Sequence, residues 1–264
     1  MLSRRVLSLA GVLTVLVSGA AWYVATRQDK VVPKSGLSLH SGDTGITYRY
    51  EDGPGNCSPD TPVPFFTRDI TDTSRLARII PPATVIERGE LKTHSYLHIA
   101  NGASVPIYAP VDGVIAWGTH VVQQNRVGKF DSTNRADEYS LFIEVDCDHY
   151  IMIDHLTDPV AAITAALPPN PLQDSRTQFL HPPVIVKAGD LLGETTGTEF
   201  RIWDFGVYDR RKKNTFPSSV RDASGRDFHA VCPYEFFDNN AREKYRRLYD
   251  KTYGTSQRVL DLCK

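Results

Sequence analysis

Alternating apolar and polar positions predict a domain built mainly from β-strands between about residues 65 and 207. Short apolar stretches bounded by Gly, Pro, Asn and Asp recur there at close intervals, which is typical of antiparallel sheets. The expected strands cover residues 105–109, 113–117, 139–145, 150–155, 184–187 and 199–208. The pattern therefore predicts a mainly β fold.

Helices and insertions are expected at four further places. The segment 157–167 opens with Thr-Asp-Pro and predicts a short helix with proline near its first turn. The charged segment 240–253 predicts a C-terminal helix with a stripe of Tyr and Leu. The polar stretch 120–137 and the proline-rich stretch 168–183 are expected to be insertions, the first of them a loop.

The chain begins with a long apolar stretch. Arg4 and Arg5 precede it, and it runs from residue 6 to about residue 26. A helix of that length spans roughly 30 Å, the thickness of a bilayer core, and the paired arginines favour a cytoplasmic N-terminus. Residues 1–27 are thus expected to be a transmembrane anchor, or a signal sequence cleaved at the small residues 18–20. In either case the rest of the chain is exported.

The expected organisation is therefore a single-pass protein of the inner (cytoplasmic) membrane, with its domain in the periplasm or outside the cell. Residues 28–64, rich in Gly, Ser, Asp and Pro, predict a linker and an irregular lead-in. The β domain is expected at 65–209, and a C-terminal extension with its helix at 210–264.

Cysteine content and net charge limit the cellular compartment and the kinds of partner to be expected. The four cysteines are Cys57, Cys147, Cys232 and Cys263; they suit an oxidising compartment and allow three pairings. A bond between Cys232 and Cys263 would tie the C-terminal tail to the domain. The formal net charge of −1 gives no reason to expect nucleic-acid binding.

Four side chains that can bind a metal ion lie in three separate segments next to strand-rich stretches. They are His94 and His98 in the run His-Ser-Tyr-Leu-His, then His155, and then Asp204. Two imidazoles and one carboxylate form a common zinc-binding set that leaves the fourth position to a reactive water molecule. The residue types therefore predict a zinc site of the hydrolase kind. Surface histidines and a structural hydrogen bond at His155 are the alternatives.

Two segments resemble a known family. They are Val-Pro-Ile-Tyr-Ala-Pro-Val-Asp-Gly-Val-Ile at 105–115, and Val-Lys-Ala-Gly-Asp-Leu-Leu-Gly at 186–193 followed by Thr-Gly-Thr at 196–198. Together they resemble the core of the lysostaphin/LytM-type zinc metalloendopeptidases, which cut peptide cross-links in bacterial peptidoglycan. The resemblance covers about residues 92–208 and implies a hybrid, barrel-like antiparallel core. Biotinyl and lipoyl carriers share such glycine turns, but neither methionine here precedes a lysine.

The resemblance also implies roles for single residues. The family holds zinc with the His and Asp of H-x-x-x-D and the second His of H-x-H; these positions fall on His94, His98 and Asp204. An imidazole and a carboxylate thus exchange places, and the set of two His and one Asp is kept. His155, in a segment similar to the family's Tyr-x-His-Leu, is implied as catalytic. Ile202 replaces the first His of H-x-H, and losing one such group costs about 10²–10⁴-fold in rate.

Strand alternation makes two further predictions. Ile202 and Asp204 share one face of their strand, so the missing imidazole would have pointed into the site. In the segment 150–155, His155 shares a face with Ile151 and Ile153, and that face is expected to be buried.

Three functions remain open from the sequence. The first is a zinc hydrolase acting on peptidoglycan peptides. The second is a catalytically inactive LytM-like module that binds cell-wall peptides or regulates another envelope protein. The third is an unrelated extracytoplasmic binding or sensor domain that shares only the β fold, in which the four metal-capable residues would not converge.

Overall fold

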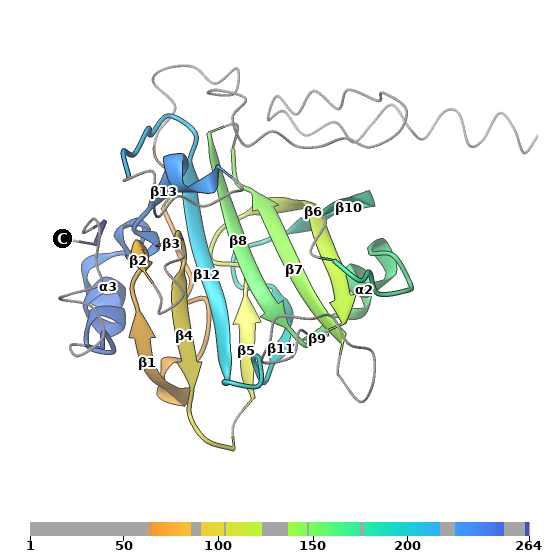
Figure 1. Ribbon diagram of the computed structural model, residues 1–264, viewed down its shortest axis with the longest axis horizontal. Coiled ribbons are helices and arrows are strands. Elements are labelled where there is room, and N and C mark those ends of the chain that lie inside the picture. The colour runs from red at the N-terminus through yellow and green to blue at the C-terminus, as the bar shows by residue number, and fades with distance from the viewer. Residues whose placement is uncertain are drawn as a thin grey trace, which may run out of the picture. The chain divides into compact units, whose positions relative to one another are not determined.

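The computed structural model (Figure 1) describes residues 63, 65–85, 91–102, 104–122, 137–146, 148–174, 177–216, 225–250 and 262–263. The predicted anchor, all but one residue of the predicted linker, Cys57, Cys147 and most of the insertion 120–137 lie outside these residues. Within the described part of the chain, no helix is long and apolar enough to cross a membrane.

Antiparallel β-sheets are the main element of the described residues, with few helices, as the alternation predicts. The largest sheet has eight strands in the order β1-β4-β12-β8-β7-β6-β10, and β13 pairs with β12 off this path (Figure 1). Its strands are β1 (Leu76–Ile80), β4 (Ser95–Ile99), β6 (Gly113–Val122), β7 (Asp137–Glu144), β8 (His149–Leu156), β10 (Gln178–Val186), β12 (Ile202–Asp209) and β13 (Ala230–Val231).

Two small sheets and short helices complete the fold. A three-stranded sheet joins β5 (Val105–Tyr108), β11 (Leu191–Thr195) and β9 (Asp158–Pro159), and β2 (Thr84–Val85) pairs with β3 (Leu91–Lys92). The helices are α2 (Ala161–Ala166), α3 (Asn239–Arg246) and the 3-10 turns η2 (Thr73–Arg75), η4 (Arg226–His229) and η5 (Pro233–Phe236). Both predicted helices are therefore confirmed, each shorter than its segment.

Each predicted strand stretch contains a strand, but some bounds differ. The stretch 199–208 begins as a turn, because Arg201 has a positive φ of 58° and its amide donates to the Thr198 carbonyl, so β12 starts at Ile202. Unpredicted strands are β1, β2, β3, β4, β9, β11 and β13, and β10 begins at Gln178, inside the stretch expected to be an insertion. Of these, β4 matters most for function, because it carries His98 and directly follows His94.

The large sheet has two buried faces with different contents. One face packs Leu97, Ile143, Ile153 and Phe205 against the small sheet of β5 and β11 in the main hydrophobic core. Burying each such side chain contributes about 1.5–3 kcal/mol. The opposite face carries aromatic rings, with Trp117 and Phe142 at 5.6 Å, Tyr150 and Tyr208 at 4.7 Å, and Met152 beside them. At the C-terminal end of β8 and the adjacent N-terminal end of β12, this second face becomes polar. The candidate site lies there.

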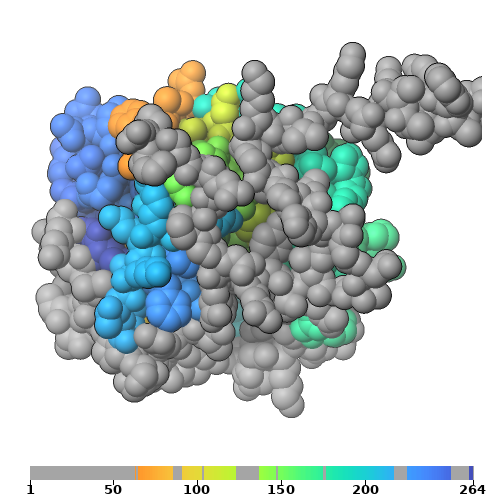
Figure 2. Space-filling model, turned by 90° about the horizontal axis from the view of Figure 1, so that it is seen from above, coloured from red at the N-terminus to blue at the C-terminus, as the bar shows by residue number. Residues whose placement is uncertain are grey.

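The C-terminal segment is attached to the edge of the large sheet. The Asp238 side chain caps α3 by accepting from the Ala241 amide, and the buried Tyr245 hydroxyl accepts from the Ile70 amide at 3.1 Å. Figure 2 shows this blue segment against the orange segment that contains β1, consistent with a bridge between Ile79 and Tyr249. The helix therefore closes one edge of the sheet.

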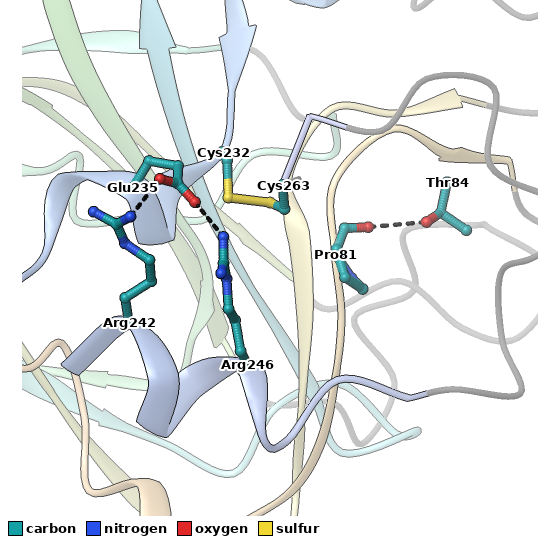
Figure 3. Close-up of a disulfide and its surroundings, with 7 residues drawn as sticks. All are labelled: Pro81, Thr84, Cys232, Glu235, Arg242, Arg246 and Cys263. Carbon is teal, nitrogen blue, oxygen red and sulfur yellow. Dashed lines mark hydrogen bonds and ion pairs between the residues drawn. A yellow bond between two sulfur atoms is a disulfide. The ribbon is translucent and has the colours of Figure 1, made fainter. Parts of the chain in front are cut away.

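A disulfide between Cys232 and Cys263 holds the end of the chain to the domain (Figure 3), and this predicted pairing is confirmed. Beside it, the Glu235 carboxylate at η5 pairs with the guanidinium groups of Arg242 and Arg246 on α3, at 2.9 and 2.8 Å. Covalent and ionic contacts thus fix the same region.

Replacing both Cys232 and Cys263 by serine is expected to lower the free energy of unfolding by about 3–4 kcal/mol. The bond joins residues separated by 31 positions, so it removes considerable loop-closure entropy from the unfolded chain. Urea-induced unfolding of the variant and the parent under oxidising conditions measures the difference. A loss below about 1 kcal/mol would show that non-covalent contacts suffice to hold the tail.

Candidate metal centre

The polar end of the second face is a row of side chains that crosses four neighbouring strands. Asp204 on β12 stands opposite Tyr96 on β4 and opposite Asp154 on β8. On β7, the Ser140 hydroxyl donates to Asp154 Oδ1 at 2.5 Å. As the sequence predicts, Ile202 and Asp204 alternate with the core residue Trp203 and so share this face.

Asp204 is the centre of the row, because its carboxylate is shared by two imidazoles. His94 Nε2 lies 3.0 Å from Asp204 Oδ2, and His155 Nε2 lies 3.3 Å from the same oxygen. The residue is 3 % exposed, and this burial alone would raise the pKa of its carboxyl group. The His94 and His155 rings outweigh burial and hold the pKa of Asp204 well below its usual range. Asp204 is therefore an anion enclosed by imidazoles.

His94 reaches Asp204 because the neighbouring strand leaves room for it at Gly206. A Cβ atom at position 206 would lie 3.0 Å from His94 Cβ and 2.9 Å from Tyr208 Cε2, so any larger residue collides with both. The His94 ring also meets the Tyr96 ring edge-on, with 5.5 Å between centroids. Gly206 thus allows the close approach that brings the first imidazole to the carboxylate.

Gly206→Ala is expected to destabilise the fold by about 1–3 kcal/mol and to displace the His94 ring. The added methyl group overpacks the space between His94 and the ring of Tyr208, which stacks on Tyr150 at 4.7 Å. Thermal unfolding gives the stability, and the His94 ring resonances in NMR spectra report its displacement. Unchanged values for both would contradict this account of Gly206.

His155 enters the site through a β-bulge. Tyr139 pairs with Leu156 and Leu141 with Ile153, so Asp154 and His155 together stand opposite the single residue Ser140. His155 has a positive φ of 66°, which is uncommon for a residue other than glycine. The bulge turns its ring onto the face of Asp154 and Asp204, as bulges beside functional sites often do. The prediction that His155 shares the face of Ile151 and Ile153 was therefore wrong.

Several contacts hold this bulge in place. Asp154 Oδ1 accepts from the His155 amide at 2.8 Å in addition to the Ser140 hydroxyl, and Thr195 Oγ1 donates to the His155 carbonyl at 2.5 Å. On the ring itself, Nδ1 lies 2.8 Å from Oε1 of the buried Glu138 on β7. The strained backbone is over-determined by its surroundings, as expected where strain serves a site.

The charge of His155 is set by three carboxylates. Burial of the ring acts to lower its pKa, but Asp154, Asp204 and Glu138 outweigh this and raise the pKa of His155 well above its usual value. Without a metal ion, these carboxylates therefore favour the imidazolium form of the ring, which balances part of the negative charge. A divalent cation at the same place would supply that positive charge instead, and would release the proton.

His98 is on the same face but outside these contacts. It lies on β4 opposite Ile202, two positions beyond Tyr96, and among the described residues it makes no ion pair with Asp204. Residues four apart along an extended chain are about 13 Å apart, which is long for two imidazoles on one ion. Its Nε2 atom is buried without a hydrogen-bond partner in the described part of the chain. A metal-binding role for His98 stays a prediction.

Burial, together with the nearby Arg78 charge, lowers the pKa of His98 to about 4. Between about pH 6.5 and 4 the unfolded chain therefore takes up a proton that the folded protein refuses, so stability falls as the pH falls. In metal-free protein, His98→Gln is expected to make the free energy of unfolding less dependent on pH over this window. Urea unfolding of both proteins at a series of pH values checks the slopes; parallel curves would contradict the prediction.

The two imidazole contacts of Asp204 have the length expected between two ligands of one zinc ion. Two ligands about 2.0–2.1 Å from a tetrahedral ion lie about 3.3 Å apart, close to the 3.0 and 3.3 Å between Asp204 Oδ2 and the two Nε2 atoms. Asp204 Oδ1 is buried with no hydrogen-bond partner among the described residues. Among the described residues, the group of possible ligands whose atoms all lie within 4.8 Å of one another is Glu138, Asp154 and His155, which includes neither His94 nor Asp204. Buried acceptors without donors are what a cation satisfies.

Sequence reasoning missed Glu138, Asp154 and Ser140. The signal for Glu138 and Ser140 was present, because alternation along β7 puts both on the face opposite the core residues Leu141 and Ile143. The same alternation along β8 marked Asp154, which lies on the face opposite the core residues Ile151 and Ile153.

Three other buried histidines have structural partners instead, and one of them, His229, contacts the Lys212 carbonyl at 2.8 Å through Nδ1. His149 Nδ1 lies 2.9 Å from Asp146 Oδ1, and His120 pairs with the Pro168 carbonyl and the Asp137 carboxylate. The site thus contains His94 and His155, with His98 nearby. A comparison with models of protein families found no match for this chain, and a comparison with curated proteins found none either.

Proposed function

We propose that the chain binds zinc through His94, Asp204 and His155 and acts as a zinc-dependent hydrolase. The single observation that carries this is the Asp204 carboxylate held between two imidazoles at 3.0 and 3.3 Å, on a buried polar row. Zinc bound by three protein ligands lowers the pKa of a coordinated water to about 7 and polarises a carbonyl group. Peptide or amide hydrolysis is the chemistry that such a site suits.

The substrate class follows from the resemblance at 105–115 and 186–198. We propose a LytM-like domain that acts on peptidoglycan peptides and is tethered by its N-terminal segment to the inner membrane, with the domain on the outer side. The first of these segments contains β5 and the second contains β11, and the two strands pair with each other in the small sheet. This arrangement is compatible with the hybrid core that the resemblance implies.

The proposed ligand set takes His155 as the third donor, where the resemblance implies His98. Geometry favours His155, because its Nε2 is already beside Asp204. The bulge at His155 supports the choice further, since a strained backbone is kept where the ring position matters.

Ile202 favours a second candidate, a module that binds wall peptides without cleaving them. It stands at the position of the family's assisting imidazole and cannot transfer a proton. Its neighbours on β12 and β4 in this register are Asp204 and His98. A slow hydrolase releases soluble peptides from the cell wall, whereas a module that only binds the wall releases none.

Digestion of cross-linked peptidoglycan by the zinc-loaded full-length protein separates the two candidates. Under the hydrolase proposal, soluble peptides with new amino termini appear with the parent protein and not with Asp204→Asn, which keeps the size of the side chain but removes its charge. Equal release by both proteins, or release by neither, would overturn hydrolysis at this site. Pull-down of the insoluble wall then reports binding alone.

A further inference from the structure

We infer that Glu138 is a positioning residue for His155: its carboxylate keeps the ring proton on Nδ1 and directs Nε2 toward Asp204. The inference deepens the proposed function and rests on it, since a ligand or base at His155 must present one defined nitrogen to the reaction. Glu138 itself would touch neither zinc nor substrate.

The geometry around the ring separates its two nitrogens. Nε2 faces Asp204 at 3.3 Å, and Nδ1 faces Glu138 at 2.8 Å. Nδ1 is buried, and its ion-pair contact in the described part of the chain is with Glu138 Oε1. Glu138 is 6 % exposed, which keeps water from competing for the contact.

The other nearby carboxylate is already engaged. Asp154 Oδ1 accepts from the Ser140 hydroxyl and from the His155 main-chain amide, so its hydrogen bonds hold the bulge, while its charge acts on the ring together with that of Glu138. The two acids therefore divide the work: Asp154 sets the backbone of His155, and Glu138 sets the orientation and proton of its side chain.

The chemistry of this pairing is well defined. A neutral imidazole carries its proton on one nitrogen, and the partner of that nitrogen decides which. Carboxylates that accept from the distal nitrogen of a metal-bound histidine raise its basicity, and their loss typically weakens metal binding by about 10–100-fold. In the peptide-hydrolysis reading, a histidine that keeps Nε2 unprotonated toward the site stays available as ligand or base.

The test uses three variants of the full-length protein. Glu138→Ala removes the acceptor, Glu138→Gln keeps an oxygen that can accept from Nδ1–H, and Glu144→Gln is the control. Glu144 lies on the same strand and face, but it pairs with the Arg210 guanidinium, away from His155. If removing any buried carboxylate on this face were enough to weaken zinc binding through a loss of stability, the control would lose zinc affinity as well.

Nitrogen NMR shifts of His155 are recorded first on metal-free protein at alkaline pH, where the ring is neutral. The proton is expected on Nδ1 in the parent, in Glu138→Gln and in Glu144→Gln, and is expected to move toward Nε2 in Glu138→Ala. An unchanged tautomer in Glu138→Ala would overturn the inference, whether or not the protein binds zinc.

Zinc affinity and stoichiometry from chelator competition are measured next. About 10–100-fold weaker binding in Glu138→Ala, partial rescue in Glu138→Gln and no change in Glu144→Gln are expected, each with one zinc per chain. Equal affinity in Glu138→Ala would overturn the inference and leave the zinc proposal standing. Two zinc ions in the parent and one in Glu138→Ala would make Glu138 a ligand, which also overturns it. No zinc in the parent would overturn the proposed function, and the tautomer would still decide the role of Glu138.

Discussion

His155→Ala is expected to weaken zinc binding by more than about 100-fold, beyond the 10–100-fold cost of losing an outer-shell partner. The substitution removes one of three proposed donors and the positive neighbour of Asp154, Glu138 and Asp204. Peptidoglycan digestion is expected to fall below detection for the same reason. Isothermal titration with zinc and the release of soluble peptides measure the two effects.

The matched control for this variant is His181→Ala, because His181 is an exposed histidine on β10 at the far edge of the sheet. It removes an imidazole of the same type without touching the site, so its zinc affinity and its activity should equal those of the parent. Circular dichroism verifies that both variants are folded. An affinity in His155→Ala within about threefold of the control would remove His155 from the ligand set.

Ile202→His is expected to raise the rate of hydrolysis by at least about 10-fold, a part of the 10²–10⁴-fold that one positioned acid–base group contributes. Position 202 shares the face of Asp204 and is partly exposed, so an imidazole there would point into the site. The substitution restores the H-x-H spacing in the altered form His-Trp-Asp. Initial rates on a cross-linked peptide, followed over a range of pH, give the comparison.

Ile202→Gln is the control, because glutamine is polar and similar in size but transfers no proton near neutral pH. A gain in Ile202→His that follows an ionisation near pH 6.5 and is absent in Ile202→Gln would identify the imidazole as its cause. Equal rates in the two variants would argue that the missing group is not what limits this site. That result would favour the module that binds wall peptides.

The sequence was sufficient where the periodicity was regular. Alternation along 199–208 correctly put Asp204 on a non-core face with Ile202, and the same rule, applied to β7, would have found Glu138. The cysteine count allowed three pairings, and the suggested bond between Cys232 and Cys263 is present. The alternation of apolar and polar residues therefore predicted the sheet and part of the site.

The position of His155 could not be obtained in this way. A β-bulge adds one residue to one strand, so every side chain beyond it changes face, and its position depends on pairing with β7. The segment 150–156 contains no glycine or proline to mark the bulge. The contacts that hold it come from Ser140 and Thr195, 15 and 40 positions away in sequence from His155.

His94 illustrates a dependence on packing across strands. Its proximity to Asp204 requires the empty volume at Gly206, which lies 112 positions later in the chain. A glycine inside a strand suggests a close approach of some group. The sequence alone does not say which group approaches. The site is thus assembled from local alternation, one bulge and one glycine gap.

The central claim, that His94, Asp204 and His155 hold one zinc ion, is tested most directly by metal analysis of the purified full-length protein. The parent, Asp204→Asn and His98→Ala are compared after the same reconstitution with zinc. The account predicts about one zinc per chain in the parent and in His98→Ala, and none in Asp204→Asn. No zinc in the parent, or full retention in Asp204→Asn, would contradict it, and loss in His98→Ala would move the third ligand from His155 to His98.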